Sequence, residues 1–140
     1  MQTLQDGDIL VVALAPGEEI VESLTAFAVE QGVTGGSFTG IGSVSELEIA
    51  FFDPEKKEYI PRVFEEPMEV GSLIGNFSKL GGKHFVHAHI TVAGPELIAF
   101  TGHLCRGVVG TACEIYVQRI SQTILRIKDP DAGFNPLHLK

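Results

Sequence analysis

The sequence predicts an α+β fold in a single domain, with a largely antiparallel β-sheet and one main helix near the amino terminus. One segment with helical periodicity lies early, over 16–32, and the rest of the chain alternates strand-like segments with turn residues. Because 140 residues with 44% hydrophobic and 20% charged side chains can form one packed core, size and composition agree. We predict a domain over 1–140, with a core over about 7–127 and an irregular tail over 128–140.

The first two elements have the clearest signals. An apolar run over 7–16, rich in β-branched residues, ends at a Pro-Gly pair and predicts a buried strand. The helix over 16–32 begins with acidic residues that suit the positive end of the helix dipole, and Gly32 is placed to end it. One helical face carries Ile20, Leu24, Phe27, Ala28 and Gln31, with Val21 beside them.

Strands and turns account for the remainder of the chain. The glycines over 35–42 match neither GxGxxG nor a P-loop, so β-bulges or a close backbone approach explain them better than a phosphate site. The apolar side chains of the tail predict docking against the domain or against a neighbour. The remaining segments are 33–53, a strand; 53–66, a charged turn and a short strand; 68–83, a strand ending in a Gly-Gly turn; 84–104, a hairpin; and 107–127, a long strand.

Charge and composition argue against several classes of function. The net charge is −8 and the ten basic residues form no cluster, so the domain lacks the positive surface that binds nucleic-acid phosphates, and we assign no DNA-binding residue. The apolar runs are too short for a membrane helix and the amino terminus resembles no secretory signal, so we expect a cytoplasmic protein without a membrane partner. Cys105 and Cys113 form no CxxC motif and indicate buried thiols.

Three of the five histidines are predicted to converge on one face of the hairpin. His87 and His89 are two residues apart in a strand, so their side chains point to the same face, about 7 Å apart. A three-residue turn that pairs Ala93 with Leu97 places His103 directly opposite His87. A slip of one residue would move His103 to the other face.

Three neutral imidazoles are typical ligands of a divalent metal, zinc above all, with iron, nickel and copper as alternatives. Three protein ligands leave a fourth position for water or substrate. The competing interpretation is a set of hydrogen-bonded histidines within the sheet or at a subunit contact. By parity His84 lies off this face and is expected to be exposed, while His138 from a neighbouring subunit or Cys105 as a soft ligand could join the site.

The catalytic residues, if the site is an active one, stay unassigned by the sequence. Glu114 is a candidate acid–base group or a partner for a ligating histidine. Arg62 and Arg106 are candidates to bind a substrate carboxylate.

The sequence resembles a free-standing PPC (plant and prokaryote conserved) domain, the domain that follows AT-hook motifs in plant nuclear proteins. The resemblance runs from residue 7 to about residue 127, and its most specific part is the HxH motif followed by Gly-His-Leu on the next strand. The motifs that carry it are GGSFTGIGSVSELEIAFFD, MEVGSLIGNFSKLGGK, HAHITVAGPELIAFTGHL and GVVGTACEIYVQRI.

The resemblance implies a homotrimer and, as in prokaryotic members, a metal site, which falls here on His87, His89 and His103. It also implies a fold similar to that of acetolactate decarboxylase, a zinc enzyme whose metal is held by an HxH pair and a later histidine. Prokaryotic members are named DNA-binding proteins by analogy with the plant proteins. This sequence has no AT-hook, because no Arg-Gly-Arg core with basic neighbours occurs in it.

Two functions therefore compete. The first is a small homotrimeric protein that binds a divalent metal, zinc by preference, with a regulatory or DNA-binding role suggested only by family analogy. The second is a metal-dependent enzyme of decarboxylase or lyase type that acts on a small oxo-acid at an open three-histidine site. DNA binding by the domain itself is opposed by the net charge of −8.

Overall fold

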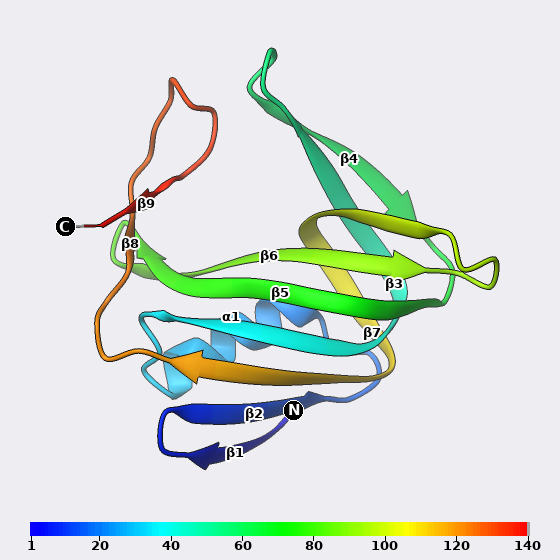
Figure 1. The fold of residues 1–140 in the computed structure, drawn as a ribbon, viewed down its shortest axis with the longest axis horizontal. Coiled ribbons are helices and arrows are strands. Elements are labelled where there is room, and N and C mark those ends of the chain that lie inside the picture. The colour runs from blue at the N-terminus through cyan, green and yellow to red at the C-terminus, as the bar shows by residue number, and fades with distance from the viewer. Residues whose placement is uncertain (140) are drawn as a thin grey trace.

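The computed structural model describes residues 1–139 and confirms the predicted fold class: a mostly antiparallel sheet with one early helix, α1 (Figure 1). Within that range no helix is long and apolar enough to cross a membrane. The elements are β1 (Gln2–Asp6), β2 (Ile9–Leu14), α1 (Ile20–Glu30), β3 (Gly36–Asp53), β4 (Glu58–Phe64), β5 (Met68–Leu80), β6 (Lys83–Ala93), β7 (Ala99–Arg119), β8 (Leu125–Arg126) and β9 (Leu137–His138).

The two longest strands make the sheet close on itself. β3 pairs with both β5 and β7, β5 pairs with β6, and β6 pairs with the first part of β7, so these four strands form a ring. β3 and β7 bend to do so, and their pairing shifts register at three places. Gly42 lies at one of them, and a side chain there would come closer than 3.0 Å to the carbonyl oxygen of Ala112. The predicted close backbone approach in this segment is therefore confirmed.

Helix α1 covers one face of the sheet and builds the core. Its amino terminus is capped by Glu19, whose carboxylate accepts hydrogen bonds from the backbone N–H of Glu22 (2.6 Å) and of Gly107 on β7 (2.8 Å). Gly32, with φ of +64°, follows the last turn, as predicted. The helix buries Ile20, Leu24, Phe27 and Ala28, four of the predicted face residues.

The opposite face of the sheet carries large apolar side chains that are exposed to solvent. In Figure 1 the helix lies on one side of β2, β7, β3 and β5 only. Side chains alternate along each strand, so the neighbours of buried core residues point away from α1. The exposed fractions on this face are 49% for Ile9, 58% for Ile41, 53% for Ile74 and 58% for Tyr116. We call these four residues the open-face patch.

The chain end departs from the predicted long strand. β7 stops at Arg119, and the two-residue strand β8 then pairs in parallel with the end of β5. β9 pairs with β8, and the ring of Phe134 packs edge-on against Phe52 of β3 at 5.6 Å between centroids. The tail therefore returns to the domain, opposite the β3–β4 hairpin (Figure 1).

Candidate metal centre

The structure brings His87, His89 and His103 together. Each offers a ring nitrogen, and these atoms lie within 4.8 Å of one another. The ring centroids of His87 and His89 are 5.4 Å apart, those of His87 and His103 are 5.0 Å apart, and those of His89 and His103 are 5.7 Å apart. No other group of this kind occurs within residues 1–139.

The register that unites them differs from the predicted one. Ala93 pairs with Ala99 instead of Leu97, so His103 lies directly opposite His89 and not opposite His87. The turn is five residues long, and Leu97 adopts a left-handed conformation within it, with φ of +57°. The predicted register was wrong by two residues, and the shared face survives because side chains alternate with a period of two.

Burial keeps two of the three imidazoles neutral. It lowers the pKa of His87 to about 4, with smaller contributions from the charge of Arg126 and from the neighbouring histidines. Burial also lowers the pKa of His103, again assisted by His89 and Arg126. A neutral imidazole has a free lone pair, which is the form that binds a metal.

His103 carries an orphaned polar atom at this site. Its Nδ1 is buried and has no hydrogen-bond partner in the described part of the chain. A buried polar atom without a partner is costly, and a metal ion bound there would satisfy it. The residues present therefore fit a divalent metal, because three imidazoles each bring a ring nitrogen to one place and His103 also has a buried ring nitrogen without a partner in residues 1–139.

Arg126 is the functional candidate that the sequence did not indicate. This side chain is 8% exposed, and its Nη2 lies 3.2 Å from Nδ1 of His87. It also donates hydrogen bonds to the Oδ1 of Asn76 (2.8 Å), the Oγ of Ser78 (3.0 Å) and the carbonyl oxygen of Asn135 (2.7 Å). The tail thus places a fixed positive charge against the histidine cluster.

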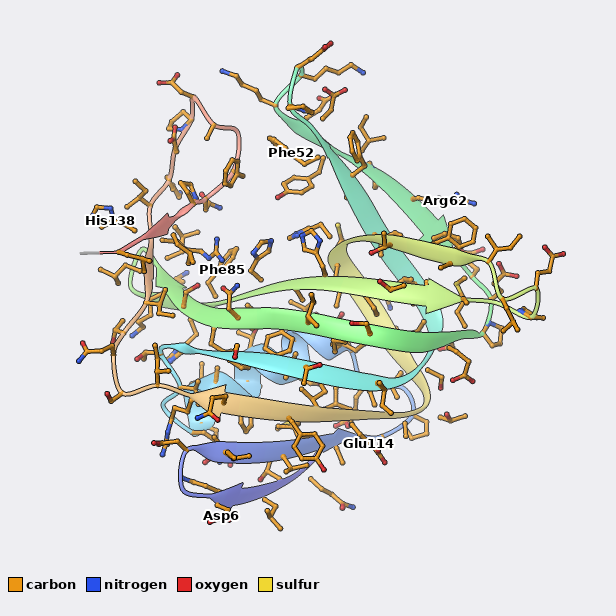
Figure 2. The ribbon with its side chains drawn as sticks, viewed as in Figure 1. Asp6, Phe52, Arg62, Phe85, Glu114 and His138 are labelled. Atoms are coloured by element: carbon orange, nitrogen blue, oxygen red, sulfur yellow. The ribbon has the colours of Figure 1, made fainter. Side chains whose placement is uncertain are left out.

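A small pocket of about 180 Å³ opens beside the cluster. Its aromatic walls come from three separate parts of the chain, and the Tyr59 ring lies 4.7 Å from that of His103. Figure 2 labels Phe85, one of these walls, close to the point where the tail returns to the sheet. The lining residues are Tyr59, Phe85, His87, His103, Arg126, Gly133, Phe134 and Asn135.

Comparison with known proteins identifies the family. The model of the Plants and Prokaryotes Conserved (PCC) domain matches residues 1–121. The chain belongs to this family. The resemblance predicted from the strand motifs is confirmed, while a search of curated proteins found no match.

Solved structures of PCC-domain relatives superpose over nearly the whole chain. A candidate DNA-binding protein from Bacteroides thetaiotaomicron is 36% identical, with 98% of this chain and 96% of that chain covered and a TM-score of 0.94. A metal-containing protein from Archaeoglobus fulgidus is 30% identical, with 96% of each chain covered and a TM-score of 0.88. A plant- and prokaryote-conserved (PPC) protein from Pyrococcus horikoshii is 31% identical, with 96% and 93% covered and a TM-score of 0.87.

The similarity to acetolactate decarboxylase is one of fold. The enzyme from Bacillus subtilis subspecies spizizenii is 11% identical and has a TM-score of 0.56. The comparison covers 88% of this chain and 62% of that enzyme. The PCC domain and the decarboxylase thus share an architecture.

The three charged residues proposed from the sequence lie elsewhere on this PCC domain. Glu114 is exposed on β7 between β2 and β3, and Figure 2 shows it far from Phe85. The guanidinium of Arg62 lies over the rings of Phe64 and Phe100, 4.7 and 4.4 Å from their centroids. Arg106 forms an exposed ion pair with Glu46 (2.8 Å). None of them lines the pocket beside the histidines.

The remaining histidines and cysteines also lie outside the cluster. His84 is half-buried, not exposed as predicted, and its Nε2 is enclosed without a hydrogen-bond partner within residues 1–139. His138 is exposed on β9 (Figure 2). Cys113 is buried as predicted, whereas Cys105 is exposed, since a register shift of the β3–β7 pairing falls at this residue.

Proposed function

We propose that this PCC-domain protein binds one divalent metal ion, zinc by preference, through His87, His89 and His103. The observation that carries the proposal is the convergence of the three ring nitrogens within 4.8 Å. The relative from Archaeoglobus fulgidus, which is described as metal-containing, supports it. In this first candidate function the metal-binding protein has a regulatory role, which family analogy alone suggests, and it is not an enzyme.

The geometry leaves room for ligand exchange at the metal. Zinc bonds of about 2.0–2.1 Å in a tetrahedron put ligand nitrogens roughly 3.3 Å apart, so small rotations of the imidazoles would close the cluster. Three protein ligands would leave a fourth position beside the pocket that His87 and His103 line. A metal bound there would supply Lewis acidity and would lower the pKa of a bound water.

Metal analysis of the purified, zinc-reconstituted protein tests this proposal. We expect about one zinc ion per chain, and a loss of that zinc in His89→Ala and in His103→Ala. His138→Ala is the matched control, because His138 is an exposed histidine outside the cluster, and it should keep its zinc. A wild type without bound zinc, or a control variant that loses it, would contradict the ligand assignment.

We further propose that the protein is a homotrimer assembled through the open-face patch. The support is physical: four large apolar side chains, each about half exposed or more, share a sheet face that no helix covers within residues 1–139. His87 and His89 point to the same face, since their neighbour Ala88 is buried on the other. Association there would bring a neighbouring copy close to the metal centre.

The mass in solution tests the assembly. Light scattering should give about 45 kDa, three times the 15.1 kDa of one chain. Ile74→Lys should shift the mass toward the monomer because it puts a charge into the patch. Val29→Lys is the control, because Val29 is 59% exposed on the outer side of α1. A wild-type monomer, or equal effects of both variants, would rule out this interface.

A metal-dependent enzyme acting on a small oxo-acid is the second candidate, and Arg126 is the observation that favours it. A guanidinium beside an open metal position is suited to a carboxylate. The pocket lining contains no carboxylate side chain, and Tyr59 is its one hydroxyl group that could move a proton. Turnover would therefore depend on Tyr59, so loss of activity in Tyr59→Phe with zinc retained is the expected mark of an enzyme. DNA binding is not proposed, because the net charge is −8.

A further inference from the structure

Within residues 1–139, Arg126 is a buried cation without an anionic partner. Its exposed fraction is 8%, and the ion pairs within residues 1–139 involve other residues. Its hydrogen-bond acceptors are all neutral: two side chains of β5, Asn76 and Ser78, the carbonyl oxygen of Asn135 and the ring of His87. Because a buried charge is costly unless it is compensated, this arrangement is suited to an anion that comes from outside the chain.

The donors of this guanidinium are not used up. Arginine has five N–H groups, one on Nε and two on each Nη. Nε donates to Ser78, Nη1 donates once to Asn135, and Nη2 donates to Asn76 and to His87. One Nη1 hydrogen therefore has no partner within the described residues, and the guanidinium borders the pocket.

Metal binding would release a second donor. Arginine can only donate, so in the metal-free site Nδ1 of His87 must accept, and the proton of this neutral imidazole is on Nε2. A metal on Nδ1 would take the lone pair that Arg126 uses. A metal on Nε2 would move the proton to Nδ1, where it would face the N–H of Nη2. In both cases the hydrogen bond between Arg126 and His87 is lost when the metal binds.

We propose that Arg126 binds the anionic end of a small carboxylate in this pocket, and that metal binding at His87 frees the guanidinium for that task. The inference rests on the proposed metal site. The volume of about 180 Å³ is below the roughly 300–1,000 Å³ of pockets for drug-sized ligands, and at about 30 Å³ per water it holds some six non-hydrogen atoms. Aromatic walls and one cation favour a compact 2-oxo-acid whose carbonyl reaches the metal position.

Cobalt-substituted protein provides a readout that does not depend on turnover. Visible absorption of Co²⁺ reports changes in its ligands, so the metal-loaded protein is titrated with pyruvate and, separately, with methyl pyruvate, which lacks the charge. We expect a saturable spectral change with pyruvate, and binding weaker by about 10- to 100-fold for methyl pyruvate. The same loss is expected for pyruvate in Arg126→Gln. Arg106→Gln, which removes an exposed arginine away from the pocket, should bind pyruvate like the wild type.

Metal affinity, measured by competition with a chromophoric chelator, supplies the second arm. Arg126→Gln should bind Co²⁺ at least as tightly as the wild type, because the variant loses a competing N–H donor and a positive charge. Three outcomes would overturn the role of Arg126 and leave the metal site standing. They are equal pyruvate affinity in the wild type and Arg126→Gln, no spectral response to pyruvate in the wild type, and weaker Co²⁺ binding by the variant. Failure of the wild type to bind Co²⁺ would overturn the metal site and this inference with it.

Discussion

Replacing Gly75 with alanine is expected to damage the core and the proposed metal site together. Gly75 lies in the middle of β5, where it pairs with Phe38 on β3 and with Ala88 on β6. A β-carbon at this position would come closer than 3.0 Å to the carbonyl oxygen of His87 and to two carbons of the Phe38 ring. Both groups are held in place, one by the strand ladder and one by the core.

The size of the effect follows from these contacts. Carbon atoms pack best about 3.5–4.0 Å apart, so the nearer carbon of the Phe38 ring would have to withdraw by more than about 1 Å. It has little room, because it is 4% exposed and its centroid lies 5.0 Å from that of Phe77. Overpacking of this kind costs about 1–3 kcal/mol, which for a domain of this size lowers the Tm by roughly 3–10 °C. Zinc affinity should fall as well, because β6 would move with His87.

Gly71→Ala is the matched control, because it makes the same change in the same strand. Its β-carbon would meet nothing nearer than the carbonyl oxygen of Thr91 at 4.0 Å, so its stability should stay within about 0.5 kcal/mol of the wild type. Thermal unfolding followed by circular dichroism gives both values, and chelator competition gives the zinc affinities. If Gly75→Ala is as stable as the wild type, or if Gly71→Ala loses as much, the packing argument is refuted.

Three further outcomes are expected. A thiol reagent should modify exposed Cys105 in the folded protein and Cys113 only after unfolding. The rate at Cys105 should keep rising past the pH at which an ordinary thiol ionises, because partial desolvation of its sulfur, with the Glu48 charge, raises its pKa. A chelator should lower the Tm of the zinc-loaded protein, because it removes about 2.7 kcal/mol of stability if the free zinc concentration was 100 times the Kd. The Tm of His103→Ala should not change when the chelator is added. Glu19→Ala should destabilise the protein by about 1–2 kcal/mol in urea unfolding, because Glu19 caps α1, whereas Glu30→Ala at the exposed far end should not.

The fold and the histidine face were predictable because their signals are local. Helical periodicity over 16–32 and period-two alternation in the strands do not depend on distant contacts. The predicted pairing across the hairpin turn was wrong by two residues. The common face of His89 and His103 was still predicted correctly, since only a register shift by an odd number of residues moves a side chain to the other face. The sheet face on which a side chain lies is thus a safer prediction than its cross-strand pairing partner.

The charged residues of the site were not predictable in the same way. Arg126 reaches His87 only because β8, a strand of two residues, pairs with the end of β5, and no sequence pattern specifies that pairing. Glu114 was proposed because its strand was expected to lie near the hairpin, but β7 bends and pairs with different strands along its length. The same bend that closes the sheet takes Glu114 to β2 and leaves His103 beside β6.

The electrostatics of the site favour a small anion over a nucleic acid. The chain as a whole carries −8, so a long polyanion meets net repulsion along its length. Within the pocket the local charge is positive, because the lining residues include Arg126 and no carboxylate. A bound divalent metal would add two positive charges. At physiological salt, charges more than about 8 Å away are largely screened, so a ligand of a few atoms experiences the local sign. A net negative charge on the whole chain is therefore compatible with the small-carboxylate site proposed at Arg126.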